Sequence, residues 1–290
     1  MFQDKLLQGK RILVTGGGTG LGRAMSEQFL RLGADVYICG RRQNVVDDTA
    51  RELMASHGGS VKAFAIDIRH AQAVDEMIET IWQEGPLDGL VNNAAGNFIS
   101  RTEDLSPRGF DAIANIVLHG TFYTTQAVGK RWIRDKHKGS VVSIVVTWVW
   151  TGSPYVVPSA MSKSGIDAMT KSLAVEWGRH GIRLNAIAPG PIYTKGAWER
   201  LSPGKDNMSR KESNPMGRQG ELSELQNLAT FLMSDGCDWL TGQTIALDGA
   251  GYLANGASFT YLADLSDEDW ANMREQIKAA NERDKAQRTV

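Results

Sequence analysis

The feature that most constrains the fold is an apolar run of strand length that ends in a glycine cluster and leads straight into a helix. After Ile12, Leu13 and Val14 the chain reads Thr15-Gly16-Gly17-Gly18-Thr19-Gly20-Leu21-Gly22, and Met25, Phe29 and Leu30 follow at helical spacing. Glycines permit a tight turn and a close backbone approach to a ligand. The helix N-terminus offers free N–H groups and a positive dipole end to a diphosphate. The stretch therefore indicates a dinucleotide site, with a glycine-rich turn that binds nothing as the alternative.

The rest of the chain alternates between strand and helix patterns. Further strands are expected at Ala34–Cys39, Val61–Ile66, Leu87–Val91, Ser140–Val146, Ile182–Ala188 and Thr244–Leu247. Helices are expected at Val45–His57, Ala71–Trp82, Pro107 to about Lys136, Pro158 to about Arg179, and Leu222–Ser234. Alternation of this kind with near-continuous apolar strands predicts an α/β fold, a Rossmann-type doubly wound parallel sheet with helices on both faces. Ligands bind beyond the carboxyl ends of such strands.

The bulk composition narrows the class of protein. No linker-like tract divides the 290 residues, which predicts a single domain over 1–290 with a C-terminal extension at about 251–290. Because Lys+Arg 32 balance Asp+Glu 33, neither nucleic acid nor a membrane surface is expected as a partner. Cys39 and Cys237 make neither a disulfide framework nor a metal site, and no metal is expected. The N-terminus has no signal pattern and the apolar run 141–150 is too short to span a bilayer, which favours the cytoplasm.

Arg41 and Arg42 follow the second expected strand, where an NAD site normally carries an acidic residue for the ribose 2′-hydroxyl. A guanidinium can instead bond a 2′-phosphate in a fork, which favours NADP(H). The alternative is a solvated basic pair at a helix start. Asp67, after the third strand, could cap the next turn.

Two motifs together resemble the short-chain dehydrogenase/reductase family. These are Thr15-Gly16-x-x-x-Gly20-x-Gly22 and Asn92-Asn93-Ala94-Ala95-Gly96, the second with one alanine more than the usual signature. The resemblance implies a Rossmann fold, a nicotinamide cofactor and commonly a homotetramer, with the helices at Pro107–Lys136 and Pro158–Arg179 at the interface. It also implies that Asp67 faces the adenine ring, which is the alternative to capping the turn. The cofactor-binding residues that it and the loop chemistry imply are Gly16, Thr19, Gly20, Leu21, Gly22, Arg41, Arg42, Asp67, Ile68, Asn93, Ala94, Gly96, Lys163, Pro189, Gly190, Ile192 and Thr194.

The usual catalytic set of the family is incomplete here. Most members carry Tyr-x-x-x-Lys, in which the lysine lowers the tyrosine pKa so that the phenol can protonate an alkoxide. This chain keeps Lys163 but has Ser159 at the tyrosine position. Val146 and Val117 stand at the usual serine and asparagine positions. Since an aliphatic hydroxyl is far less acidic than a phenol, simple ketone–alcohol chemistry loses its proton donor.

One branch of the family, the NADPH-dependent 2,4-dienoyl-CoA reductases of mitochondrial type, departs in the same way. The resemblance includes Asn97-Phe98-Ile99-Ser100, Val156-Val157-Pro158-Ser159-Ala160 and Pro189-Gly190-Pro191-Ile192. It implies that the Asn97 amide donates to the thioester carbonyl, that Ser159 lies near the nicotinamide ribose or phosphate, and that Lys163 binds the ribose. The branch's carbonyl-donating tyrosine is replaced by Trp148, which could donate through its indole N–H or only fill the pocket. Tyr155 is a weaker substitute donor.

The expected function is NADPH-dependent reduction of an unsaturated acyl-CoA thioester, most specifically a 2,4-dienoyl-CoA in fatty-acid β-oxidation. Two alternatives stay open: a reductase of another conjugated or carbonyl compound, and an NADP-binding protein with little turnover. Glycines, prolines and mixed charges from 195 to about 220 suggest a lid over the substrate. Charged side chains there could meet the anionic CoA moiety or stay solvated, namely Lys195, Arg200, Lys205 and Arg218.

Overall fold

A computed structural model describes residues 1–194, 214–255 and 259–287. Its centre is a seven-stranded, wholly parallel sheet in the order β3-β2-β1-β4-β5-β6-β7. The strands are β1 Arg11–Thr15, β2 Asp35–Gly40, β3 Val61–Ala65, β4 Gly89–Asn92, β5 Gly139–Ile144, β6 Ile182–Pro189 and β7 Thr244–Leu247. The strand order reverses between β1 and β4, so the two loops that follow these strands flank the crevice where such sheets bind ligands.

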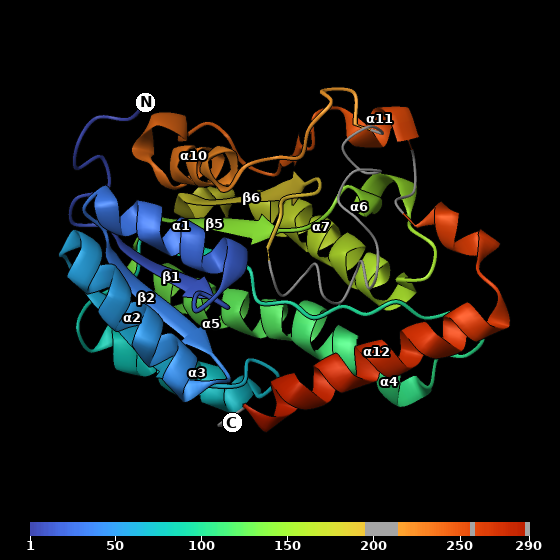
Figure 1. Ribbon diagram of the computed structural model, residues 1–290. Helices are drawn as coiled ribbons and strands as arrows, with labels where there is room; N and C mark the ends of the chain where they lie inside the picture. Colours follow the sequence, from blue (N-terminus) through green and yellow to red (C-terminus); the bar gives the residue numbers. More distant parts are fainter. Residues whose placement is uncertain (195–213, 256–258, 288–290) are drawn as a thin grey trace.

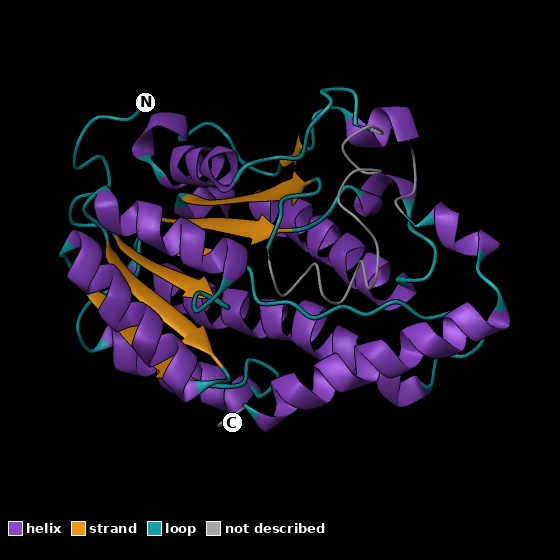
Figure 2. Ribbon diagram, viewed as in Figure 1, coloured by secondary structure: helices purple, strands orange, loops and turns teal. Residues whose placement is uncertain are grey.

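Helices cover both faces of the sheet (Figure 2). The longer ones within the Rossmann-type unit are α1 Gly20–Arg31, α2 Gln43–His57, α3 Ala71–Trp82, α4 Pro107–Ala114, α5 Gly120–Asp135, α7 Val157–Trp177 and α10 Leu222–Met233. The others are α6 Trp148–Thr151, α11 Gly251–Asn255 and α12 Asp267–Ala286. No helix in the described ranges is both long and apolar enough to cross a bilayer. The α/β class, the doubly wound parallel sheet and its single domain are thus confirmed.

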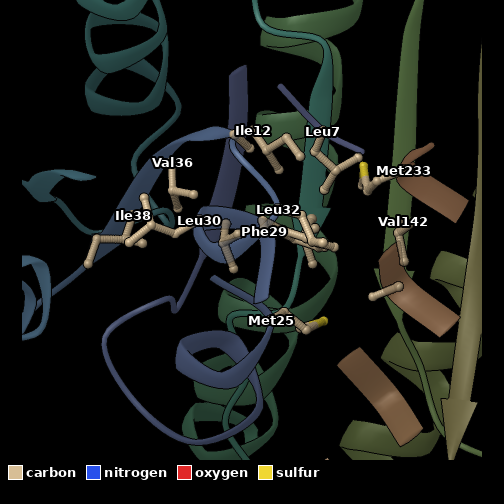
Figure 3. Close-up of a cluster of buried hydrophobic side chains, with 14 of the residues drawn as sticks. Leu7, Ile12, Met25, Phe29, Leu30, Leu32, Val36, Ile38, Val142 and Met233 are labelled. Atoms are coloured by element: carbon tan, nitrogen blue, oxygen red, sulfur yellow. The ribbon is translucent and has the colours of Figure 1, made fainter. Parts of the chain in front are cut away.

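The two faces are built from alternate residues of the same strands. In β1, Ile12 and Val14 belong to the cluster under α1, α2 and α10, whereas Leu13 belongs to the cluster under α3, α5 and α7. Figure 3 shows the first cluster, in which Met25 and Phe29 of α1 lie in one group with Ile12, Val36 and Ile38 of the neighbouring strands. Because both faces are buried, the strands read as continuous apolar runs, and that pattern made the sheet predictable.

Several predicted boundaries were wrong. The fifth strand ends at Ile144 and not at Val146, since the chain turns there into the short helix α6. The helical stretch from Pro107 is interrupted by a π-helical turn at Asn115–His119, after which α5 ends at Asp135. The helix that follows β2 begins at Gln43, two residues before the predicted start. The errors at β5 and α2 lie at element ends, where propensity gives the weakest signal, whereas the π-helical turn lies inside a predicted helix.

Beyond β7 the chain forms α11, a 3-10 turn at Thr260–Asp264 and α12. In Figure 1, α12 (red) runs across the view towards the C-terminus, and its last turns reach the end of β2. Its capping box, Ser266 with Asp269, fixes where it begins. Trp270 and Ile277 are buried against the loops that follow β4 and β5. This helix therefore packs along the carboxyl edge of the sheet, where the candidate site lies.

Candidate cofactor and substrate site

The turn between β1 and α1 has the geometry of a phosphate cradle. Gly16 and Gly20 have φ of 65° and 55°, which L side chains rarely adopt. A Cβ on Gly22 would lie 2.4 Å from the Gly16 carbonyl oxygen. The N-cap residue of α1, Thr19, makes no side-chain capping bond, and the first turn holds no acidic side chain. The terminal N–H groups of α1 are thus uncapped by these side chains, and the cradle fits a dinucleotide diphosphate.

Hydrogen bonds lock the loop after β4 to the loop after β1. The Asn93 amide donates to the carbonyl oxygens of Thr15 and Gly16 at 3.0 and 3.2 Å. The Thr15 hydroxyl accepts the backbone N–H groups of Asn93 and Ala94, each at 3.0 Å, and donates to the Val91 carbonyl. These hydrogen bonds fix the distance between the loops after β1 and β4, which form two walls of the crevice. Thr15 was not among the predicted site residues, although a hydroxyl at the end of a buried strand is a usable signal.

Arg41 and Arg42 lie directly after β2, at the end of the sheet where an adenosine ribose would sit. Arg42 is the N-cap residue of α2, and its guanidinium meets the Asp284 carboxylate at 3.3 Å.

Asp67 is buried; its carboxylate accepts the Arg69 backbone N–H at 3.0 Å and pairs with the Arg69 guanidinium. Burial alone would raise the pKa of Asp67, but these bonds together with the charges of Arg69 and Arg41 hold it below its ordinary value. The Asp67 carboxylate thus caps the turn after β3, its role beside the adenine stays a prediction, and neighbouring Ile68 is buried.

The loop after β6 forms another wall of the same crevice. The side chain of Thr194 lies 3.6 Å from the point where a Cβ on Gly20 would stand, so it borders the start of α1. Pro189 ends β6, and a Cβ on Gly190 would meet Asp248 at 2.7 Å. Ile192 pairs with Gly220 in an isolated bridge. The loops after β1, β4 and β6 thus converge, as the sequence analysis expected of them.

Ser159 and Lys163 lie one turn apart on α7, and both are buried. The Lys163 ammonium donates a hydrogen bond to the Ile144 carbonyl at the end of β5. Burial lowers the pKa of Lys163 from 10.5 to about 8. The ammonium is thus buried with a backbone carbonyl as its hydrogen-bond partner. Such a cation is poised to donate hydrogen bonds to ribose hydroxyls.

Asn97 lies in the loop after β4, and its side-chain oxygen accepts the Phe98 backbone N–H at 2.9 Å. The Asn97 side chain is thus bonded to the neighbouring backbone. That bond occupies the amide oxygen and leaves the Nδ2 hydrogens as the donor end. Gly96 precedes it, with the Ile116 side chain 3.4 Å from the point where a Cβ would stand.

An apolar cluster joins the Asn97 loop to the loop after β5. Phe98 and Ile99 pack in the same cluster as Trp148 and the first turn of α7. The Ser100 N–H also donates to the Tyr155 carbonyl at 2.9 Å. The indole of Trp148 is 8% exposed and meets the Phe259 ring edge-on, 5.5 Å between centroids. Tyr155 has a φ of 63° and packs on Trp270 of α12 at 5.0 Å, so its ring is engaged with the C-terminal helix.

The two valines at usual catalytic positions are apolar packing residues. Val117 is fully buried within the π-helical turn, and Val146 packs against the cluster that holds Trp148. Neither can donate or accept a proton, which removes two of the family's usual polar groups. Within the described ranges, no group of three or more His, Cys, Asp and Glu side chains is placed to hold a metal.

Of the charged residues expected to meet a CoA moiety, Lys195, Arg200 and Lys205 lie outside the described residues. Arg218 is described, and its guanidinium pairs with Glu224 at 2.6 Å in an exposed position. This pair holds the pKa of Glu224 at about 2.

Comparisons with known proteins agree with this geometry. The family profile described as enoyl-(acyl carrier protein) reductase matches residues 16–252. A Bacillus anthracis short chain dehydrogenase of known structure superposes with a TM-score of 0.78 at 40% identity, over 87% of this chain and 98% of that one. The chain belongs to the short-chain dehydrogenase/reductase family. It is therefore an oxidoreductase of a nicotinamide cofactor.

Two curated relatives share more than the family. A Caenorhabditis elegans protein named as a probable 2,4-dienoyl-CoA reductase, (3E)-enoyl-CoA-producing, is 42% identical over 98% of this chain and 94% of its own length. A Bacillus subtilis protein named as a probable 2,4-dienoyl-CoA reductase, (2E)-enoyl-CoA-producing, is 40% identical over 85% of this chain and 98% of its own length. The two names differ in where the product keeps its double bond.

Proposed function

We propose that this protein is an NADPH-dependent 2,4-dienoyl-CoA reductase that leaves a (3E)-enoyl-CoA. The observation that carries the proposal is the pairing of a buried Lys163 with Ser159 at the usual position of the phenol. Such a site keeps the cation that holds the nicotinamide ribose and lacks the acid that a ketone reductase needs. The 42% identity to a relative of that name supports the same reading.

Each cofactor group has residues suited to it. The uncapped N-terminus of α1 takes the diphosphate, Lys163 holds the nicotinamide ribose, and Arg41 and Arg42 take the 2′-phosphate. NADPH, when bound, supplies a hydride. The walls made by the loops after β1, β4 and β6 keep the nicotinamide end at a fixed place beside the substrate.

Reduction of a dienoyl thioester needs a hydrogen-bond donor to the thioester oxyanion and does not need a strong acid. Hydride addition at C5 of the dienoyl thioester moves electrons through the conjugated bonds onto the thioester oxygen, giving a dienolate. The Asn97 Nδ2 donates to that oxygen, and donors of this kind are worth about 3 kcal/mol each. Proton uptake at C2 from water leaves the C3–C4 double bond, so the product is the 3-enoyl thioester.

The proposal is tested by supplying NADPH with a ladder of dienoyl-CoA, enoyl-CoA and ketone substrates. Loss of NADPH absorbance is expected with dienoyl-CoA esters and not with simple ketones. Mass and NMR analysis of the product in deuterated water should place one deuterium at C2. Inactivity towards every dienoyl and enoyl thioester would exclude this function, and a 2-enoyl product would refute the proposed site of protonation.

A different conjugated or carbonyl substrate is the second candidate, favoured by one observation: Trp148 fills the place of a donating tyrosine and is buried against Phe259. We expect the Trp148→Tyr variant to reduce dienoyl-CoA within about tenfold of the wild-type rate, because Asn97 carries most of the oxyanion stabilisation. Steady-state kinetics on both proteins measure this. Dienoyl-CoA activity that arises only in the variant would mean that the natural substrate is another compound.

Removal of the basic pair should separate the two cofactors. The Arg41→Ala/Arg42→Ala double variant is expected to raise the KM for NADPH about 10- to 100-fold, because two guanidiniums at the 2′-phosphate are lost. The KM for NADH should change by less than about threefold. Kinetics with each cofactor at saturating dienoyl-CoA measure the ratio, and an equal effect on both cofactors would argue against a 2′-phosphate site at these residues.

Assembly and location remain predictions of this proposal. A homotetramer would use the exposed apolar side chains Phe122 on α5 and Val175 on α7, which are 44% and 86% exposed. We predict a cytoplasmic enzyme that acts in β-oxidation.

A further inference from the structure

The last turns of α12 meet the cofactor end of the sheet through one basic residue. Arg42 Nη1 lies 3.3 Å from an Asp284 carboxylate oxygen and 3.2 Å from the Gln287 side-chain oxygen. The Arg42 and Asp284 side chains are 27% and 22% exposed, so the pair is partly shielded from water. Arg42 is also one of the two arginines to which the proposed function assigns the 2′-phosphate. The Asp284 carboxylate and a 2′-phosphate would therefore compete for the same guanidinium.

The two halves of α12 are attached differently. The first half is held by buried Trp270 and Ile277 and by ion pairs at 2.8 and 2.7 Å, Arg101 with Asp267 and Arg274 with Asp104. Beyond Ile277, no described residue of the helix is buried. The contact with Arg42 thus fastens a helix end that has no apolar anchor of its own, while the first half stays packed.

The Asp284 carboxylate is a poor neighbour for a phosphate at Arg42. It places a full negative charge beside that guanidinium, although the same turn of α12 also carries Arg283 and Lys285. A ribose 2′-hydroxyl has no charge to compete with this carboxylate, but a 2′-phosphate has. Asp284 and Gln287 lie past position 252, where the match to the family profile ends, so the profile does not cover this contact.

We propose that Asp284 sets the affinity for the 2′-phosphate by competing with it for Arg42, and that NADP(H) frees the last turns of α12 when it binds. This rests on the proposed use of NADP(H). Removal of the Asp284 carboxylate should tighten binding of any ligand with a 2′-phosphate and leave ligands without one unchanged. Asp284 is thus a specificity-determining residue that lowers the affinity for NADP(H), the preferred cofactor.

Calorimetry of the full chain with 2′,5′-ADP and 5′-AMP tests the idea without turnover. Asp284→Asn is expected to lower the Kd for 2′,5′-ADP about three- to tenfold, with the Kd for 5′-AMP unchanged. Glu282→Gln removes the same charge from an exposed site on the same helix and should change neither value. In an Arg42→Ala background, Asp284→Asn should have no effect. An unchanged or raised Kd, or an equal effect on both ligands, would overturn the proposal.

Hydrogen exchange supplies a second readout that needs no variant. Saturating 2′,5′-ADP should speed exchange of the amides in 280–287, whereas saturating 5′-AMP should not. Slower exchange there would mean that the helix end closes over the phosphate, contrary to the proposal. If wild-type protein binds 2′,5′-ADP no more tightly than 5′-AMP, then NADP(H) use itself is wrong and this inference falls with it. A wild-type preference without an Asp284 effect refutes the inference alone.

Discussion

Replacing Asn97 with alanine is expected to lower kcat for a dienoyl-CoA about 10²- to 10³-fold, with little change in the affinity for NADPH. The side-chain oxygen of Asn97 is held by the Phe98 N–H, so the Nδ2 end has a fixed direction before substrate arrives. A donor set in advance of reaction costs no reorganisation when charge develops on the thioester oxygen. Because Ser159 is a poor acid, the Asn97 amide must supply more of the stabilisation of the oxyanion than it would if a phenol were present.

Two further variants separate the roles of the Asn97 side chain. Asn97→Asp keeps an oxygen for the Phe98 N–H and replaces the donor with a negative charge, so its kcat should fall at least as far as that of the alanine variant. Asn272→Ala, at an exposed position on α12, should behave as wild type. Stopped-flow measurement of NADPH oxidation reports the chemical step, and fluorescence titration reports cofactor affinity. If Asn97→Ala keeps kcat within tenfold, the oxyanion donor is another group.

The fold could be predicted from the sequence because its signals are local and repeated. Each strand of the sheet reads as a short apolar run, and the glycines after β1 have few other uses at that spacing. The ends of the elements were less accurate. The π-helical turn at Asn115–His119 differs from an α-helix by one hydrogen-bond register, and no residue pattern announces that change.

The candidate site was predictable as a set of loops and less so as a set of contacts. Strand order brings the loops after β1 and β4 together, so Gly16 and Asn93 could be placed as neighbours in advance. The contact between Arg42 and Asp284 joins residues on opposite ends of the chain, and only the path of α12 decides it. Its first half did carry a signal, since Trp270, Met273 and Ile277 recur at helical spacing. The second half is polar, and nothing in its sequence says what it meets.

Replacing Lys163 with methionine is expected to abolish most activity and to make the protein more stable. The ammonium is buried, and the lowered pKa of Lys163, about 8 against an ordinary 10.5, corresponds to about 3 kcal/mol of unfavourable burial. Methionine fills similar space without the charge. In the variant the Ile144 carbonyl loses its hydrogen bond, which costs about 1–2 kcal/mol of stability. The free energy of unfolding should therefore rise by a net amount of about 1–2 kcal/mol at pH 7. Turnover should fall about 10²-fold or more, because the nicotinamide ribose loses its donor.

The pH dependence distinguishes burial of the charge from simple repacking. Below pH 8 the lysine is protonated in both the folded and the unfolded chain, so the wild type bears the whole cost of burying the charge. As the pH rises from 8 towards 10.5, the folded protein carries a neutral amine and this cost disappears. The melting temperature of the variant should therefore exceed that of wild type at pH 7. Near pH 10.5 the order should reverse, because only the loss of the hydrogen bond to Ile144 then separates the two proteins. Lys171→Met, which removes a half-exposed ammonium paired with the buried Asp167 on the same helix, should give no gain at either pH. If the Lys163→Met variant is more stable than wild type by the same amount at pH 7 and pH 10.5, the Lys163 ammonium is better solvated than its burial implies. The activity lost in the variant would then come from changed packing and not from the lost charge.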